Sequence, residues 1–267
     1  MLSPKEIAIK YSQVGAEKTK LGIGKLFLPA ILAGVFIALG AFGSQVVSID
    51  AGKSLGKFLS GLVFPVGLMM VVMTGAELFT GNNLISLSVL NKKATLTGML
   101  KNWAVVYLGN LAGSILVALL LTYSHSYSLF DGRLAEAVVT TGQNKVLLSF
   151  SDAFLRGILC NILVCIAVWV SFAAKDAVGK VVGLFLPIML FVISGYEHCV
   201  ANMYFIPAAL LVSQEYGIPS DSLTWGHFLT KNLLPVTLGN IVGGAGVVAG
   251  GYYLIYLHGH SKKSSIQ

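Results

Sequence analysis

Two nine-residue segments constrain the fold of this chain most, because each places an acid and an asparagine inside a long apolar run. The first is Thr-Gly-Ala-Glu-Leu-Phe-Thr-Gly-Asn at residues 74–82, and the second is Ser-Gly-Tyr-Glu-His-Cys-Val-Ala-Asn at residues 194–202. An ionisable residue inside a membrane span is costly and indicates a functional site. Two such segments in corresponding halves of a chain predict broken helices around a site near the middle of a bilayer.

The composition predicts an integral membrane protein. Hydrophobic residues make up 55% of the chain, charged residues 11%, and the mean hydropathy is +0.81, whereas a soluble domain carries about 25% charged residues. The 267 residues accommodate roughly six or seven spans of about 20 residues each, and we expect no soluble domain beside them. The net charge of +7 is typical of Lys and Arg that orient a membrane protein, so we do not expect a nucleic-acid partner. No signal peptide is expected at the N-terminus.

Six apolar runs follow one another, and two of them are too long for one straight helix. The runs cover residues 26–48, 58–90, 100–123, 150–173, 181–212 and 233–257. The second and fifth carry the polar segments, so each is predicted to be two half-helices joined by unwound backbone, which membrane depth permits only where protein or a cavity covers it. Gly75, Gly81 and Gly195 would permit the unusual backbone angles.

The repeat extends into the neighbouring spans. The third and sixth runs match through Asn102, Gly109, Asn110 and Gly113 against Asn232, Gly239, Asn240 and Gly243, and the first and fourth through Phe27-Leu28 against Phe154-Leu155. Each half then contains three spans, and because three is odd the second half crosses the membrane in the opposite sense. The predicted fold is an all-α membrane protein with six transmembrane helices in two inverted three-helix repeats, at residues 26–123 and 150–257, with spans two and five broken.

The remaining segments flank a single transmembrane domain predicted at residues 26–257. Residues 1–25 begin with Ser3-Pro4-Lys5-Glu6, the arrangement of a capping box with proline at the first helical position. We expect an amphipathic helix along the membrane surface; a solvated tail is the alternative. Residues 258–267 are predicted to be a cytoplasmic tail.

The distribution of basic residues predicts the orientation. With six spans both termini share a side, and that side holds twelve of the 18 Lys and Arg residues. The other six are Lys53, Lys57, Arg133, Lys145, Arg156 and Lys231. The side richer in basic residues is the cytoplasmic one, so both termini are predicted to be cytoplasmic, in the inner or plasma membrane of a prokaryotic cell.

His198 is the histidine predicted to lie at mid-span depth. Imidazole changes charge near neutral pH, so a histidine in a helix break is a candidate proton relay; a core histidine bonded to Glu197 or to a carbonyl is the structural alternative. Glu77 and Glu197 occupy equivalent places in the two halves, and this symmetry favours a structural role. We expect them to accept hydrogen bonds from freed backbone amides of the opposite half.

The other candidate residues are individually weaker. Neutral donors and acceptors at similar depth are Thr80, Asn82, Asn161 and Asn202, and side chains that would narrow a pore are Phe64, Leu68, Phe79 and Phe191. The cysteines, all inside apolar runs, are predicted to be reduced packing residues. No motif of a catalytic nucleophile, phosphate loop or metal site occurs, so we expect no enzymatic activity, no metal and no cofactor.

Taken together, the motifs resemble those of the formate/nitrite transporter family, whose members carry formate, nitrite or hydrosulfide. The resemblance covers nearly the whole chain. It rests on the two polar segments, on Lys101-Asn102-Trp103 leading to Gly109-Asn110, on Cys160-Asn161 with Val164-Cys165, and on Pro-Val-Thr-Leu-Gly-Asn at residues 235–240.

That resemblance implies an aquaporin-like subunit with its own pore, assembled as a homopentamer. It assigns a central histidine to His198, its neighbouring acid to Glu197 and a loop threonine to Thr80. A vestibule lysine corresponds to Lys145, supported only by the Lys145-Val146 step and the spacing to Phe150, and a fourth-span asparagine to Asn161. The implied constriction consists of Phe64, Leu68 and Phe191.

The sequence therefore leads to one hypothesis and one alternative. The hypothesis is a membrane channel or transporter for small monovalent anions of weak acids, namely hydrosulfide, formate or nitrite, with possible proton linkage through His198. The alternative is an aquaporin-like pore for water or small neutral solutes, since fold alone does not decide function. The sequence leaves open which anion is physiological, whether protons are coupled, the direction of flux and whether the N-terminal helix gates the pore.

Overall fold

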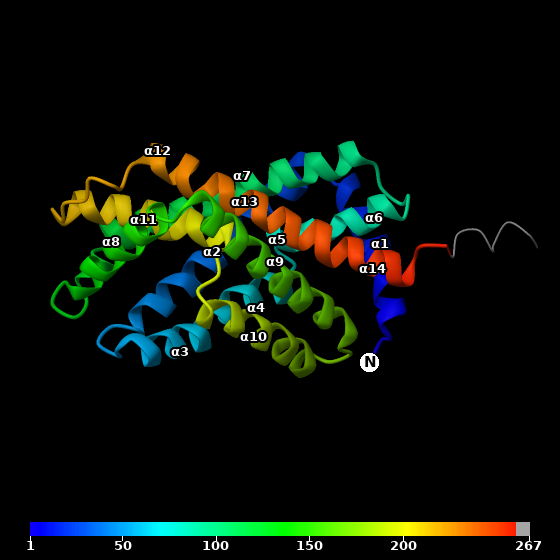
Figure 1. Cartoon of the computed structure of the whole chain (residues 1–267), viewed down its shortest axis with the longest axis horizontal. Coiled ribbons are helices and arrows are strands. Elements are labelled where there is room, and N and C mark those ends of the chain that lie inside the picture. Colours follow the sequence, from blue (N-terminus) through cyan, green and yellow to red (C-terminus); the bar gives the residue numbers. More distant parts are fainter. Residues whose placement is uncertain (260–267) are drawn as a thin grey trace, which may run out of the picture.

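The computed structural model describes residues 1–259, and within them every regular element is helical. Figure 1 shows an elongated bundle in which the long helices run side by side. Helices α3 (Lys53–Val63) and α8 (Arg133–Val146) lie at one end, and α1 (Pro4–Lys20), α6 (Ser86–Leu90) and α14 (Gly251–Tyr256) lie at the other. The expected C-terminal tail lies almost entirely outside the described residues, since residues 260–267 are not among them.

Five helical stretches of the described chain are long and apolar enough to cross a membrane. Three are the continuous helices α2 (Ile23–Val46), α7 (Leu96–Tyr123) and α9 (Phe150–Ala173). A fourth runs from Lys53 to Thr74 through α3 and α4 (Pro65–Thr74), with Phe64 between them. The fifth, Trp225–Leu257, contains α12 (Trp225–His227), α13 (Leu234–Ile241), α14 and two π-helical stretches, η3 (Phe228–Leu233) and η4 (Val242–Gly250). Helix α10 (Ala177–Ile193) is apolar but shorter.

Helical structure stops inside both polar segments. After α4 the chain is non-helical until α5 (Phe79–Asn82), which continues through η1 (Asn83–Ile85) into α6. After α10 it is non-helical until α11 (Cys199–Glu215). Gly75 and Gly195 have φ of +76° and +69°, which side chains rarely adopt. The expectation for Gly81 was wrong, because it lies inside α5 and its carbonyl accepts a bond from the Tyr11 hydroxyl (3.2 Å).

Two helix pairs pack in the same way, α2 against α7 and α9 against α13 with η4. Gly113 and Gly243 mark the equivalent contacts. A Cβ at Gly113 would lie 2.0 Å from the Ile31 carbonyl oxygen, and one at Gly243 would lie 2.3 Å from the Ile158 carbonyl oxygen. Backbone at these distances leaves no room for a methyl group, so the glycines permit the close approach of the two helices.

Two shorter helices flank the bundle. In α1 the predicted capping box is confirmed: the Glu6 amide donates to Ser3 Oγ, and the Ser3 amide donates to Glu6 Oε2. The helix buries Ile7, Ala8 and Tyr11 against α6, α9, η4 and α14. Helix α8 lies where the sequence indicated only a loop between the third and fourth spans, and it carries Lys145 in its last turn.

Candidate functional site

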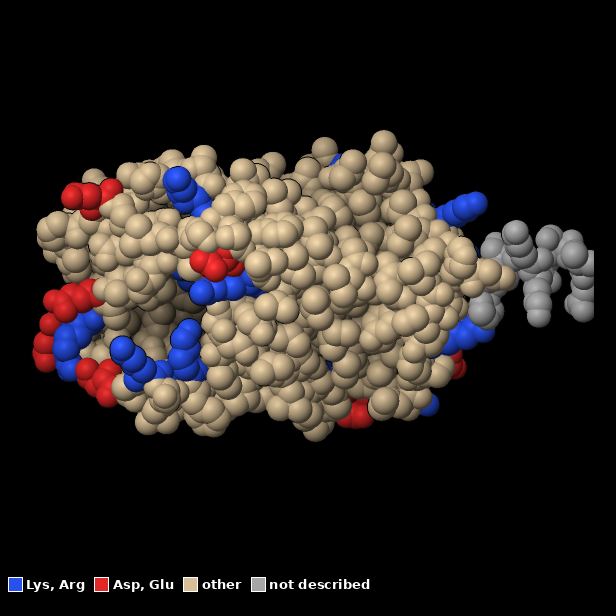
Figure 2. Space-filling view, viewed as in Figure 1, with Lys and Arg blue, Asp and Glu red and all other residues tan. Residues whose placement is uncertain are grey.

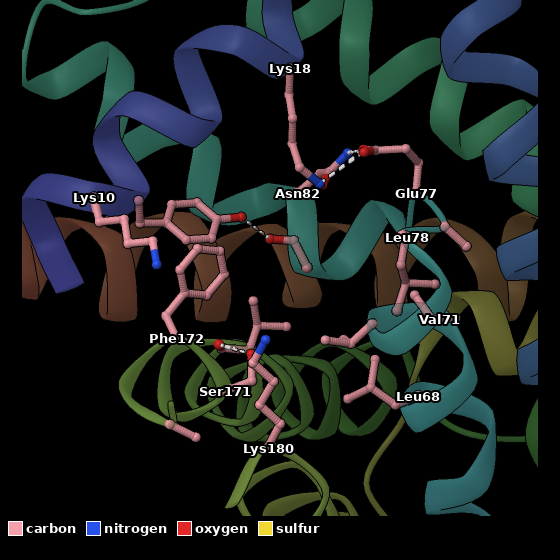
Figure 3. A pocket seen from close by; sticks show the side chains of 17 residues that line it. Lys10, Lys18, Leu68, Val71, Glu77, Leu78, Asn82, Ser171, Phe172 and Lys180 are labelled. Atoms are coloured by element: carbon pink, nitrogen blue, oxygen red, sulfur yellow. Dashed lines mark hydrogen bonds and ion pairs between the residues drawn. The ribbon is translucent and has the colours of Figure 1, made fainter. Parts of the chain in front are cut away.

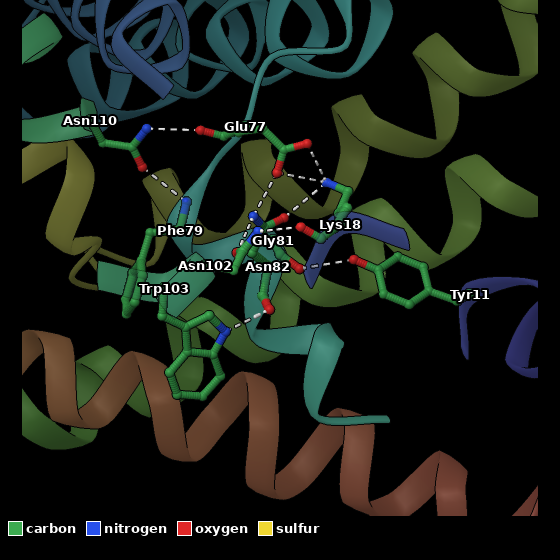
Figure 4. A network of polar contacts seen from close by, with 9 residues as sticks. All are labelled: Tyr11, Lys18, Glu77, Phe79, Gly81, Asn82, Asn102, Trp103 and Asn110. Carbon is green, nitrogen blue, oxygen red and sulfur yellow. Dashed lines mark hydrogen bonds and ion pairs between the residues drawn. The ribbon is translucent and has the colours of Figure 1, made fainter. Parts of the chain in front are cut away.

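The acid of the first polar segment lies in a hydrogen-bonded network (Figure 4). The Lys18 ammonium group lies 3.0 Å from Glu77 Oε1 and donates to Glu77 Oε2 (3.1 Å) and Asn82 Oδ1 (2.9 Å). The Asn82 amide nitrogen donates to Glu77 Oε2 (2.7 Å) and to Asn102 Oδ1 (2.9 Å). The buried carboxylate is thus partnered by a cation from α1 and by an amide from its own segment.

The second polar segment contains the same arrangement. Lys145 donates to both oxygens of Glu197 (2.9 and 3.0 Å), and Asn202 donates to Glu197 Oε2 (2.6 Å) and to Asn232 Oδ1 (2.7 Å). The structure therefore brings together two residues that were predicted separately, Lys145 and Glu197. It corrects the role expected for the two acids: among the described residues, lysine and asparagine side chains bond their carboxylates, and no backbone amide does.

Asn110 and Asn240 form hydrogen bonds with the backbone groups that have no helical partner at the two breaks. Asn110 accepts from the Phe79 amide (2.9 Å) and donates to the carbonyls of Ala30 (2.8 Å) and Glu77 (2.9 Å). Asn240 accepts from the Cys199 amide (2.9 Å) and donates to the carbonyls of Gly157 (2.8 Å) and Glu197 (2.9 Å). One neutral side chain thus replaces the intrahelical partners lost at each break, as buried backbone requires.

Lys18 is a site residue that the sequence analysis missed. Asn102 donates to the Lys18 carbonyl (3.3 Å) and Asn232 to the Lys145 carbonyl (2.9 Å), so both lysine-bearing helices are held to a span in the same way. A signal for this equivalence exists in the sequence. Lys18 precedes Phe27 by nine residues, and Lys145 precedes the matching Phe154 by nine, so extending that match toward the N-terminus pairs the two lysines.

His198 and Thr80 join the two polar segments. Thr80 Oγ1 lies 2.8 Å from His198 Nε2, and both residues are buried. His198 Nδ1 accepts a bond from the Ala201 amide (3.0 Å) and caps the N-terminus of α11. Because Nδ1 accepts, the neutral imidazole carries its proton on Nε2 and donates it to Thr80 Oγ1. The hydroxyl hydrogen of Thr80 then has no acceptor among the described residues.

A cavity of about 330 Å³, here called the α1 cavity, opens beside α1 (Figure 3). The charged and polar side chains that line it belong to Lys10, Lys18, Glu77, Asn82, Ser171 and Lys180. Leu68, Val71 and Leu78 form part of its apolar wall. Since Lys18 pairs with the single carboxylate, the cavity keeps two uncompensated positive charges.

A second cavity of about 490 Å³, here called the α8 cavity, opens at the other end of the bundle. It contains His198, Glu197 and Asn202 together with four basic residues, Lys53, Lys57, Lys145 and Arg156. Figure 2 shows basic side chains around a hollow at this end of the molecule. Both cavities are therefore electropositive and attract anions.

Apolar side chains separate the cavities. Phe64 lines the α8 cavity and Leu68, one helical turn later, lines the α1 cavity. The Phe64 and Phe191 rings meet edge to face with centroids 5.4 Å apart, and Phe191 stacks on His198 at 5.9 Å. The three predicted constriction residues Phe64, Leu68 and Phe191 thus lie where the cavities approach each other, and all three are buried.

Two predicted residues lie elsewhere. Asn161 lines neither cavity; its amide donates to Asn83 Oδ1 (2.7 Å) and to the Asn240 carbonyl (2.6 Å). Phe79 packs against Trp103 and Tyr107 instead of narrowing a pore. The three cysteines are buried and unpaired, and within residues 1–259 no group of three His, Cys, Asp or Glu side chains is placed to hold a metal ion.

Comparison with known proteins gives the family. The model of formate/nitrite transporters matches residues 5–254 of this chain. A probable formate transporter of Methanothermobacter thermautotrophicus is 39% identical over 96% of this chain and 97% of its own length. The formate channel FocA of Haemophilus influenzae is 41% identical over 82% of each protein. These relatives are channels or transporters, not enzymes.

Solved structures agree with the sequence relatives. A pentameric formate channel with formate bound is 38% identical, with a TM-score of 0.78 over 88% of this chain and 98% of that chain. An FNT family ion channel is 27% identical, with a TM-score of 0.85 over 94% of this chain and 98% of that chain. The chain is an integral membrane protein and belongs to the formate/nitrite transporter family.

Proposed function

We propose that the protein is a channel for small monovalent anions of weak acids, with formate, nitrite and hydrosulfide as its substrate class. The observation that carries the proposal is the arrangement of two electropositive cavities on either side of a short apolar constriction, with the Thr80 and His198 pair beside it. The names of the relatives support formate as the first substrate to test.

Attraction of the anion is the task of the basic residues. In each cavity one lysine is held against a buried carboxylate, Lys18 on Glu77 and Lys145 on Glu197, which fixes its position and cancels its charge. The uncompensated positive charge then comes from Lys10 and Lys180 in the α1 cavity and from Lys53, Lys57 and Arg156 in the α8 cavity. A small anion accumulates there because the cavity walls focus the field.

Passage requires the loss of charge. An anion loses its water when it moves from a cavity into the constriction formed by Phe64, Leu68 and Phe191. This desolvation favours the protonated, neutral form of the acid. We propose that the anion takes a proton from a hydronium ion in the cavity, which leaves a water molecule, and that the neutral acid crosses the constriction and returns the proton to water in the other cavity. Thr80 donates its free hydroxyl hydrogen to the passing substrate, and His198 holds that hydroxyl in place.

The architecture proposed with this function has six crossings in two inverted repeats, residues 26–123 and 150–257, with spans two and five broken. The matching roles of Glu77 and Glu197, and of Asn110 and Asn240, support it. We further propose a homopentamer, as in one solved neighbour, in a prokaryotic inner or plasma membrane. Both termini are proposed to be cytoplasmic, which places the α1 cavity on the cytoplasmic side.

Flux into liposomes tests the function. Purified protein is reconstituted and assayed with formate, nitrite and hydrosulfide across about pH 5 to 8, and we expect flux to rise as the pH falls because more substrate is protonated. Thr80→Val, nearly isosteric, should lower the flux strongly, whereas the matched control Thr230→Val, at an exposed helix position, should not. Efficient transport of a strong-acid anion with no response to pH, or rapid water or glycerol flux without anion transport, would contradict the proposal.

A further inference from the structure

Helix α5 carries Thr80 and is too short to fix its own position. It comprises four residues and continues directly as the 3₁₀ helix η1, whose hydrogen bonds have poorer geometry than those of an α-helix. A turn of this length is marginal alone, because nucleating a helix fixes several residues for one hydrogen bond. The place of the Thr80 hydroxyl beside His198 Nε2 (2.8 Å) therefore depends on contacts from outside α5.

Side chains from three other helices donate hydrogen bonds to three successive carbonyls of α5, and Figure 4 shows two of these bonds. The donors and acceptors are the Tyr11 hydroxyl and the Gly81 carbonyl (3.2 Å), the Trp103 indole nitrogen and the Asn82 carbonyl (2.9 Å), and the Cys165 thiol and the Thr80 carbonyl (3.5 Å). All three donor side chains are buried. The backbone of α5 is thus bonded from α1, α7 and α9 at once.

The second half of the chain has no such donors at the matching places. In the register that pairs Asn102 with Asn232 and Lys18 with Lys145, the three donors Tyr11, Trp103 and Cys165 correspond to Val138, Leu233 and Ala38. None of these aliphatic side chains can donate a hydrogen bond. The matching segment there begins α11, a continuous helix of 17 residues, in which carbonyls accept from amides one turn later. The donors therefore occur in the half whose helix is interrupted, which indicates that they hold α5 in place.

We propose that Trp103 and Cys165 are positioning residues for Thr80. They hold the backbone of α5 where the Thr80 hydroxyl meets both His198 and the passing acid. Both side chains are absent from the linings of the two cavities, so they act on the substrate only through Thr80. This inference rests on the proposed function, in which Thr80 donates to the neutral acid. Loss of either bond should slow passage through the constriction without changing the attraction of the anion into the cavities.

Amide hydrogen exchange on the purified full-length oligomer tests the positioning without an assay of transport. Trp103→Phe should speed exchange at residues 79–85 by about fivefold, the factor expected for one lost hydrogen bond of ordinary strength. Cys165→Ala should have a smaller effect, because a thiol is a weak donor. The matched controls Trp169→Phe and Cys160→Ala remove the same groups from other buried positions of α9 and should leave exchange at residues 79–85 unchanged. Wild-type exchange there in both test variants would overturn the proposal.

Formate flux in liposomes tests whether the two residues act through Thr80. With Thr80 present, Trp103→Phe should lower the maximal flux about fivefold and leave the half-saturating formate concentration unchanged, because the charges of the cavities are untouched. In the Thr80→Val background the same substitution should cause no further loss, since the hydroxyl that it positions is gone. Should Trp103→Phe fail to assemble, Cys165→Ala supports the same comparison.

The two measurements separate the possible failures. An equal loss of flux in the Thr80 and Thr80→Val backgrounds would overturn the positioning role and leave a purely structural one. Faster exchange at residues 79–85 together with wild-type flux in Thr80→Val, or with no formate flux in the wild type, would keep the positioning of α5 and refute the proposed function instead.

Discussion

Replacing Asn240 by Leu should destabilise the protein more than replacing Glu197, although Glu197 is the charged residue. Asn240 accepts from the Cys199 amide and donates to the Glu197 and Gly157 carbonyls, all of them buried at the second break. Leucine is similar in size but makes none of these bonds. The substitution therefore tests the hydrogen bonds without opening a large cavity.

The structure sets the expected loss of folding free energy. The Gly157 carbonyl lies inside α9, where the helix supplies another donor. The Cys199 amide and the Glu197 carbonyl lie at the break, and each unpaired buried group costs about 1–3 kcal/mol, which gives about 2–6 kcal/mol in all. Glu197→Gln keeps an oxygen that can accept from both Lys145 and Asn202, so it leaves no buried donor without an acceptor, and we expect a loss of about 1–2 kcal/mol from exchanging a charged acceptor for a neutral one.

The assay is retention of the oligomer after heating, followed by size exclusion, with both variants and wild type prepared in parallel. Asn240→Leu should lose half of its oligomer at a temperature about 10 °C below wild type, and Asn110→Leu at the first break should behave alike. Glu197→Gln should fall between Asn240→Leu and wild type. An Asn240→Leu protein as heat-resistant as wild type, beside a Glu197→Gln protein that collapses, would refute this account of the breaks.

Three further outcomes are expected. His198→Asn should leave a folded oligomer, because Asn also caps helices. It should lower formate flux at every pH, because the Thr80 hydroxyl is no longer held in place. A variant that keeps its flux but loses the dependence of flux on pH would instead identify His198 as the titrating relay. Lys18→Met should speed hydrogen exchange in α1, because Glu77 and Asn82 lose their cation, whereas the exposed control Lys20→Met should not. Hydrogen bonds from the Ser3 side chain and backbone lower the pKa of Glu6. The stability that Glu6 adds to the α1 cap is therefore complete above the ordinary Glu pKa and is lost as the pH falls through the lowered pKa of the folded state. Amide hydrogen exchange at residues 4–8 that becomes faster only in that acidic range would confirm this.

Both non-helical stretches fall within the polar segments that the sequence singled out, because the physical requirement for them is local. A left-handed residue beside an acid in an apolar run is recognisable from Gly75-Ala76-Glu77 and Gly195-Tyr196-Glu197 alone. The sequence did not predict which side chain would satisfy the freed backbone. Carboxylates are the stronger acceptors, yet each break also exposes a carbonyl; an ionised carboxylate cannot donate to that carbonyl, whereas an amide such as Asn110 both accepts and donates.

Two other features depend on more than the pattern of membrane spans. Residues 133–146 are too polar for a span, so the apolar runs indicate only a connection there, whereas the structure forms α8 and carries Lys145 in its last turn. Asn161 was expected in the pathway from its depth in the fourth run and from the resemblance, but its orientation depends on how α9 packs against η4. A Cβ at Gly244 would lie 2.4 Å from the Asn161 amide nitrogen, so that amide points into the helix contact and away from both cavities.

The two halves differ most where they bind the lysines, and this difference bears on how the cavities function. Lys18 donates hydrogen bonds to both Glu77 and Asn82, so its ammonium group is bonded within the protein. Lys145 bonds Glu197 alone, with its ammonium group 5.2 Å from the centre of the Phe205 ring, and Asn202 Oδ1 has no partner in the described chain. The α8 cavity also holds a larger excess of cations than the α1 cavity, three against two. Corresponding residues of the two polar segments thus lie beside cavities of unequal charge, and an anion that binds strongly in one cavity need not bind in the other.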